Sequence, residues 1–124
     1  MKMNTIGKYI KYLIQLANKS DIYHKHAAAI FFNKRPIVFT INTRHGNNSK
    51  HAEENAINRL VSLMPDLVQK SKKGRSGRGK FQMVVIQITA SGHRVANSRP
   101  CPRCTKLINN TPFIDRVYFS TPAK

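Results

Sequence analysis

The chain contains two stretches whose apolar residues recur at helical spacing. In residues 4–18 and in residues 51–64, hydrophobic positions return every three or four residues, which is typical of one buried face of an amphipathic helix. The first stripe consists of Ile6, Tyr9, Ile10, Leu13, Ile14 and Ala17. The second stripe consists of Ala52, Ala56, Ile57, Leu60, Val61 and Met64. The pattern therefore predicts two helices that each cover a sheet or another helix.

Four other stretches read as strands. Residues 27–32 form a continuous apolar run, as expected of a strand buried on both faces. Residues 37–41, 81–89 and 114–120 are rich in β-branched and aromatic residues, which favour strands. A short turn separates the first two strands, so the pattern predicts an antiparallel hairpin. Residues 43–50 are polar and are predicted to form a loop.

The order of these elements predicts the fold class. A short third helix is expected to begin at Cys101, with Pro102 in its first turn, where a missing N–H costs nothing. Strand, helix and strand then follow one another, so the last two strands should be parallel with a right-handed connection. The sequence predicts one α/β domain over residues 1–124, with a mixed sheet flanked by about three helices in two or three layers. It contains no internal repeat.

Positive charge dominates the composition. The chain has 22 Lys and Arg against 5 Asp and Glu, a formal charge of +17. This imbalance predicts a polyanionic partner such as nucleic acid, although a merely soluble basic protein would also show it. The densest segment is the Gly-rich stretch 70–80, predicted to be a flexible loop that contacts phosphates. Its basic residues are Lys70, Lys72, Lys73, Arg75, Arg78 and Lys80.

The same segment contains a false phosphate-binding motif. Residues 74–80 fit G-x-x-x-x-G-K, but Phe81 stands where that motif needs Ser or Thr. The segment also precedes a strand instead of following one, which excludes the P-loop arrangement.

The N-terminal residues, the lengths of the apolar runs and the cysteines indicate the cellular compartment of the protein. The N-terminus shows no secretory apolar region, and no apolar run approaches the ~20 residues that span a bilayer. The only two cysteines form a C-x-x-C pair, which favours a metal or redox role over a disulfide framework. We therefore expect an intracellular, reducing compartment, either cytoplasm or nucleus, and no membrane partner.

Four residues in two distant stretches could build a metal centre. His51, Cys101 and Cys104 supply one imidazole and two thiolates, the ligand types that zinc prefers. Three protein ligands leave a fourth position open for water, as in catalytic sites. Glu53, two residues after the histidine, is the nearby carboxylate that would move protons.

Two other interpretations of the cysteines stay open. Cys101 and Cys104 could form a redox pair, although a thioredoxin-like motif lacks a distant His-x-Glu. A closed structural zinc site would need a fourth ligand from elsewhere. The histidines available for it are His24, His26, His45 and His93.

The motifs themselves resemble a known signature. His51-Ala52-Glu53 together with Pro100-Cys101-Pro102-Arg103-Cys104 is similar to the zinc signature of the cytidine deaminase superfamily. The longer run through Asn55-Ala56-Ile57 resembles the deoxycytidylate deaminase branch most closely. The resemblance implies zinc ligation by His51, Cys101 and Cys104 and proton transfer by Glu53. It further implies substrate binding by Asn42 and by the Ala52 backbone.

The resemblance also sets expectations for fold and function. It implies a cytidine-deaminase-like sheet, here truncated after the fourth strand, because family members usually continue with another helix and strand. It implies a zinc-dependent hydrolytic deaminase of a cytosine nucleotide, free or within single-stranded nucleic acid, and self-association into a homo-oligomer or larger assembly. The alternative is a non-enzymatic basic packaging protein of a nucleoprotein or virion that keeps the fold and its zinc.

Overall fold

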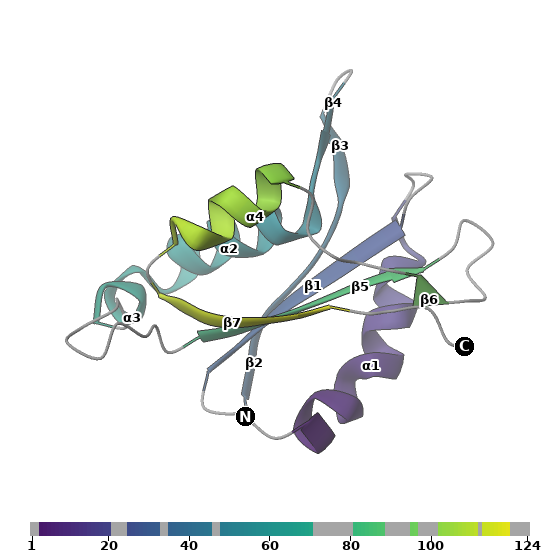
Figure 1. The fold of residues 1–124 in the computed structure, drawn as a ribbon, viewed down its shortest axis with the longest axis horizontal. Coiled ribbons are helices and arrows are strands. Elements are labelled where there is room, and N and C mark those ends of the chain that lie inside the picture. Colours follow the sequence, from purple (N-terminus) through teal and green to yellow (C-terminus); the bar gives the residue numbers. More distant parts are fainter. Residues whose placement is uncertain are drawn as a thin grey trace.

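The computed structural model describes residues 3–20, 25–32, 35–45, 48–70, 81–88, 95–96, 102–111 and 113–119. A mixed β-sheet forms the centre of the molecule, and helices lie on both of its faces (Figure 1). The helices are α1 (Met3–Ala17), α2 (Ala52–Leu63), α3 (Pro65–Lys70) and α4 (Pro102–Asn109). The strands are β1 (Lys25–Phe32), β2 (Arg35–Ile41), β3 (Thr43–His45), β4 (Asn48–Lys50), β5 (Phe81–Ile88), β6 (Val95–Ala96) and β7 (Ile114–Phe119).

The sheet has the order β2-β1-β5-β6, and β7 also pairs with β5. β1 is antiparallel to β2 and to β5, whereas β5 and β7 are parallel. The predicted hairpin and the predicted parallel pair are therefore both present, and the α/β mixed-sheet prediction is confirmed. β1 and β5 lie in the middle of the sheet, which explains why their sequences are nearly continuous apolar runs.

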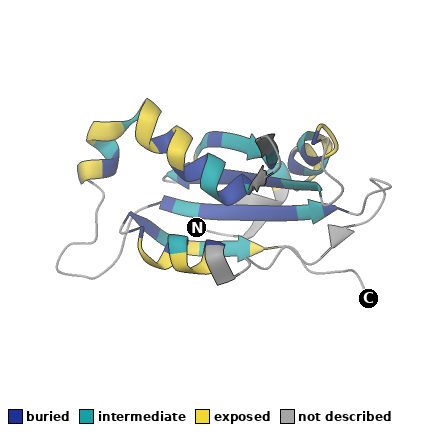
Figure 2. Ribbon diagram, turned by 90° about the horizontal axis from the view of Figure 1, so that it is seen from above, coloured by how far each residue is buried: buried dark blue, intermediate teal, exposed yellow. Residues whose placement is uncertain are grey.

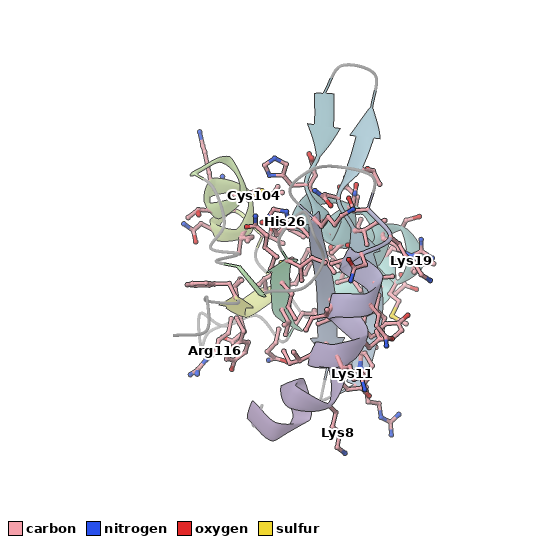
Figure 3. All side chains as sticks on the ribbon, turned by 90° about the vertical axis from the view of Figure 1, so that its right-hand side faces the viewer. Lys8, Lys11, Lys19, His26, Cys104 and Arg116 are labelled. Carbon is pink, nitrogen blue, oxygen red and sulfur yellow. The ribbon has the colours of Figure 1, made fainter. Side chains whose placement is uncertain are left out.

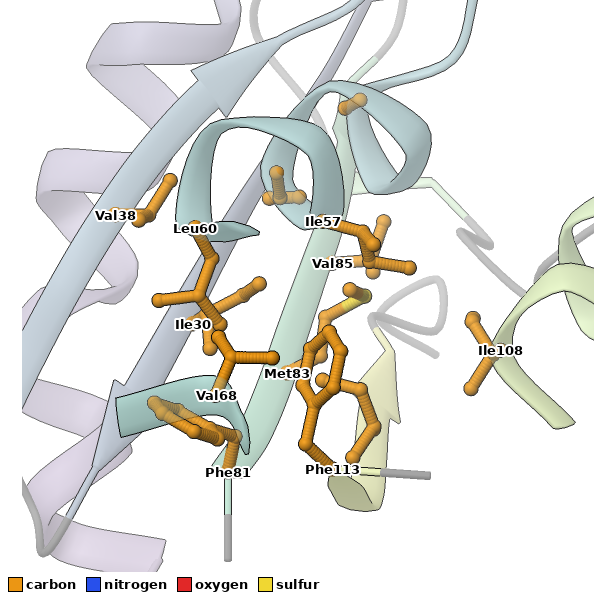
Figure 4. Close-up of a cluster of buried hydrophobic side chains, with 14 residues drawn as sticks. Ile30, Val38, Ile57, Leu60, Val68, Phe81, Met83, Val85, Ile108 and Phe113 are labelled. Carbon is orange, nitrogen blue, oxygen red and sulfur yellow. The ribbon is translucent and has the colours of Figure 1, made fainter. Parts of the chain in front are cut away.

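Helices cover both faces, so of the two arrangements predicted, three layers is the one observed. α1 packs on one face, where its stripe joins alternate residues of β1 and β5 in a buried cluster. α2, α3 and α4 pack on the other face around a second cluster (Figure 4). The largest members of this second cluster include Ile30, Val38, Leu60, Phe81, Met83 and Phe113.

One prediction for the segments outside the sheet is wrong. Residues 43–45 and 48–50, predicted as part of a loop, form the antiparallel two-stranded hairpin β3–β4, with Thr43 opposite Lys50. This hairpin has no apolar face, so hydrophobic patterning could not reveal it. Of the predicted basic loop 70–80, the structure describes Lys70, which ends α3, and the loop itself stays a prediction. Pro65 opens this helix, at the position where its missing N–H is tolerated. Residues 71–80 lie outside the described part of the chain.

Burial follows the layers. The centre of the sheet is buried, and exposed residues gather on the outer surfaces of the helices (Figure 2). Among the described residues, no helix combines the length and the apolar character needed to cross a membrane.

Candidate metal centre

The start of α2 directs a histidine toward α4. His51 is the residue before the helix, with extended backbone angles of φ −72° and ψ 151°, and its carbonyl accepts the first helical hydrogen bond from the Asn55 N–H at 3.0 Å. Its side chain does not cap the helix. Instead, Nδ1 of His51 lies 3.0 Å from Sγ of Cys104, a residue 53 positions away in the sequence. The two distant motifs therefore meet in space.

Cys104 reaches this point from the first turn of α4. Pro102 is the first residue of that helix, as the sequence predicted. α4 lies alongside α2 on the same face of the sheet (Figure 1), and the Cys104 side chain is buried, with 2% of its surface exposed. Cys101, the third predicted ligand, lies outside the described residues.

The described pair suits a zinc ion by its chemistry. One imidazole nitrogen and one sulfur are donors that zinc accepts, and usual bond lengths with tetrahedral angles would set them about 3.5 Å apart. The observed 3.0 Å is slightly shorter, so a small outward movement of either side chain would make room for the ion. Among the described residues no group of three or more His, Cys, Asp or Glu side chains is close enough to hold a metal. Adding Cys101 would complete the predicted set of three.

Glu53 is a buried carboxylate two residues after His51 in the sequence. It lies in the first turn of α2, and only 4% of its surface is exposed. Burying a carboxylate costs free energy unless it gains compensating interactions. The first turn of α2 offers the carboxylate a favourable interaction with the helix dipole, and its role in proton transfer stays a prediction.

Asn42 has structural contacts that the sequence did not predict. Its side-chain Oδ1 accepts a hydrogen bond from Oγ of Ser20 at 2.7 Å and another from the backbone N–H of His26 at 3.1 Å. The residue is 6% exposed, and it joins the segment after α1 to the start of β1. Asn42 therefore braces the end of β2, and its role in substrate binding stays a prediction.

Further hydrogen bonds fix the start of α2 against the sheet. Oγ1 of Thr40 donates to the carbonyl oxygen of Ala52 at 2.8 Å. Nδ2 of Asn55 donates to the carbonyl oxygen of Ile41 at 2.8 Å and to Oγ1 of Thr43 at 3.1 Å. From the sequence alone, Asn55 either braces the helix or reaches the pocket, and Thr40 is not singled out. The Thr40 side chain therefore holds the Ala52 carbonyl against β2, and the Asn55 side chain ties the first turn of α2 to the end of the same strand.

The remaining predicted residues are dispersed or outside the described part of the chain. His26 lies half-buried in β1, and His45 lies in β3, where its side chain is not described. His24 and His93 fall outside the described residues. Of the predicted phosphate contacts, Lys70 ends α3. The other five, all outside the described residues, are Lys72, Lys73, Arg75, Arg78 and Lys80.

Comparison with known proteins identifies the family. The sequence profile described as the cytidine and deoxycytidylate deaminase zinc-binding region matches residues 3–121. The chain belongs to this family. The family description names a zinc-binding region, so zinc is the metal expected for this chain. No curated protein sequence matches the chain.

Solved structures of a family enzyme share the fold. The dCMP deaminase of cyanophage S-TIM5 in its apo form superimposes with a TM-score of 0.65 at 17% identity, covering 98% of this chain and 86% of that one. The same enzyme in complex with dCMP and dUMP gives a TM-score of 0.60 at 17% identity, covering 96% and 82% of the two chains. The mixed sheet flanked by helices is therefore the deoxycytidylate deaminase fold.

The bracing role of Asn55 is testable by stability. Asn55→Ala is expected to lower the free energy of unfolding by about 1–3 kcal/mol, because it removes two hydrogen bonds and leaves the Ile41 carbonyl without its donor. The measurement is urea denaturation followed by circular dichroism. Asn58→Ala, on the exposed side of the same helix, is the matched control and should change stability by less than about 0.5 kcal/mol. Equal effects of the two substitutions would contradict the assignment.

Proposed function

We propose that this protein is a zinc-dependent hydrolytic deaminase of a cytosine nucleotide. The observation that carries the proposal is the 3.0 Å contact between Nδ1 of His51 and Sγ of Cys104, which joins two motifs from distant parts of the chain. Family membership and the buried Glu53 at the same helix terminus support it.

The proposed metal site uses three residues of this chain. His51 and Cys104 would hold the ion from α2 and α4, and Cys101 would add the third ligand. When bound, zinc would lower the pKa of a water molecule to near ~7 and so supply a nucleophile at neutral pH. A set of three protein ligands leaves room for that water.

Glu53 would carry the protons of the reaction. Overall, water and cytosine give uracil and ammonia: the water oxygen bonds to the ring carbon that bears the amine, and the bond from that carbon to nitrogen breaks. The Glu53 carboxylate would accept a proton from the water and deliver it to the ring nitrogen next to that carbon. It would then move the second proton to the departing amine. Its buried position excludes bulk water as a competing proton acceptor.

Deoxycytidylate is the first substrate to test. The structurally similar phage enzyme is a dCMP deaminase, and one of its structures contains dCMP and dUMP. These two nucleotides differ by the conversion of cytosine to uracil that we propose here. Asn42 and the Ala52 backbone are the residues we propose for holding the base, and the basic surface suits a phosphorylated substrate.

The alternative function is that of a packaging protein that keeps the fold without turnover. The charge of +17 favours this alternative, because a free-nucleotide enzyme has no need of so large an excess. Glu53 argues against it, since a purely structural zinc site does not use a buried carboxylate.

Metal analysis combined with an activity assay separates the two functions. Freshly purified protein is expected to contain about one zinc ion per chain and to release ammonia from dCMP, cytidine, single-stranded DNA or single-stranded RNA. Removal of the metal with a chelator should abolish the release, and added zinc should restore it. Zinc without ammonia release from any of these substrates would favour the packaging function. Absence of zinc would contradict the proposed centre.

A further inference from the structure

We propose that the surface where α1 meets the edge strand β2 binds single-stranded nucleic acid. This inference goes beyond the proposed function, because it requires neither zinc nor turnover. It rests on a pocket, an exposed aromatic ring and a set of cations that lie together at this edge.

The pocket opens at the edge of the sheet beside β2, and residues of α1 on one face and of α2 on the other also line it. Its volume is about 430 Å³, within the range of small-molecule sites. Leu16, Phe39 and Ile41 form its apolar wall, whereas Thr43, Asn55 and Arg59 supply polar groups. An apolar wall beside a guanidinium suits a planar base linked to a phosphate.

An exposed aromatic ring stands next to this pocket. Tyr12 is 47% exposed, although most large apolar side chains of the described chain are buried. Its ring centroid lies 4.9 Å from that of Phe39, at 76°, and Phe39 in turn contacts Tyr9. These ring contacts limit the movement of Tyr12, while 47% of its surface stays exposed. A fixed exposed ring is a platform on which an unpaired base can stack.

Helical spacing places cations beside the same ring. Lys8, Tyr12 and Leu16 are separated by four residues each, so they share one side of α1. Lys11 is also exposed on this helix, and Lys19 lies two residues after its end (Figure 3). Arg35 begins β2 and is exposed, and so is Arg59 at the pocket.

Carboxylates are nearly absent from this part of the chain. Residues 1–41 contain a single acidic residue, Asp21, so α1, β1 and β2 carry none. The cations of this edge therefore create a positive potential that phosphates can neutralise. A positive surface beside a stacking platform is the usual arrangement for binding single strands.

A second copy of the chain fits this edge less well. Two copies meeting here would oppose lysines and arginines with no carboxylate on α1, β1 or β2 to pair them. β2 also begins with Arg35-Pro36, and a charged residue followed by a proline without an N–H hinders strand-to-strand association. A duplex fits less well than a single strand, because paired bases offer no free face to Tyr12.

The test measures binding of fluorescent oligo(dT) and oligo(U) by anisotropy across a salt series. Both lack cytosine, so turnover cannot affect the result. Tyr12→Ala is expected to weaken binding by about 5- to 100-fold with an unchanged salt slope, because only stacking is lost. Tyr12→Phe keeps the ring and should bind like the unmodified protein, which controls for folding.

A charge-matched pair of variants tests the position of the surface. Arg59→Gln should weaken binding and reduce the slope of log K against log salt by about 0.7, the value for one lost phosphate contact on a single strand. Arg116→Gln removes the same charge from the exposed side of β7, away from the lysines of α1 (Figure 3), and should leave the slope unchanged. Equal effects of both variants would overturn the proposal, since binding would then follow net charge alone.

Sedimentation analysis of the same variants tests whether a second copy of the chain binds this surface instead. If Tyr12→Ala converts a dimer to a monomer while its affinity for oligonucleotides is unchanged, the surface is an interface between copies and the proposal is wrong. Loss of oligonucleotide affinity with no change in mass supports it. Because these readouts need no deamination, they remain informative even if the proposed enzyme activity is not found.

Discussion

Glu53→Gln is expected to lower the rate of deamination by about 10²- to 10⁴-fold, the usual contribution of a positioned acid–base group. Glutamine has nearly the same size and can occupy the same buried position, but its amide can neither accept nor release the transferred proton. The substitution should therefore reduce kcat and leave the zinc content unchanged. The measurement is ammonia release from the best substrate, with metal content determined on the same sample.

Glu54→Gln is the matched control for that prediction. Glu54 also lies in the first turn of α2, so its carboxylate is close to the same helix terminus. Its substitution by glutamine removes the same charge as Glu53→Gln. It is half-buried instead of buried, and neither the sequence nor the structure gives it a role in the reaction. Its rate should stay within about threefold of the unmodified protein. An unchanged rate in Glu53→Gln would remove the proposed mechanism, whereas equal losses in both variants would indicate an electrostatic effect of the helix terminus.

The fold could be predicted where hydrophobic patterning reports on burial. β1 and β5 are continuous apolar runs because both faces of the sheet are covered, and the stripe of α1 matches its packing on one face. The order of elements then gave the parallel pairing of β5 with β7 through a helical crossover. Each of these inferences uses local sequence together with a general rule of chain connection.

Other features depend on contacts that patterning does not contain. The β3–β4 hairpin is held by backbone pairing between polar residues, so it has no apolar signal. The antiparallel pairing of β1 with β5 joins strands separated by about half of the chain, and no local residue specifies it. The predicted apolar stripe ends at Met64 and Pro65 begins α3, because proline is compatible both with the position after a helix and with the first turn of another.

The candidate site likewise has features that the sequence predicted and features that it did not. The spacing of His51 and Cys104 within recognisable motifs predicted that they meet, and the structure brings them into contact. The supporting contacts were predicted only in part: Asn42 was expected to bind substrate, the role of Asn55 was left open and Thr40 was not singled out. All three act through partners on other elements, which local sequence does not contain. A serine or asparagine at the end of an element reads from sequence as a turn or cap, and only its partner reveals that it holds the site together.

Cys104→Ser is expected to remove most of the bound zinc and to lower deamination by more than about 100-fold. Substituting a group that merely supports a metal ligand typically costs 10- to 100-fold in affinity or activity, so losing a ligand should cost more. Serine is similar in shape to cysteine, but its hydroxyl is not a thiolate and does not hold zinc in such a set. Metal content after gel filtration, compared with the unmodified protein, measures the effect.

A packing control separates ligation from stability at this position. Cys104 is 2% exposed, so its replacement could loosen α4 even without a metal. Ile108→Val removes one methyl from the buried side of the same helix and should cost about 0.5–1.5 kcal/mol in stability while zinc stays bound. Zinc retained in Cys104→Ser would contradict zinc ligation by Cys104. It would favour the interpretation of Cys101 and Cys104 as a redox pair. That interpretation makes the opposite prediction, since a redox pair would show reversible disulfide formation in thiol titrations and no dependence of activity on metal.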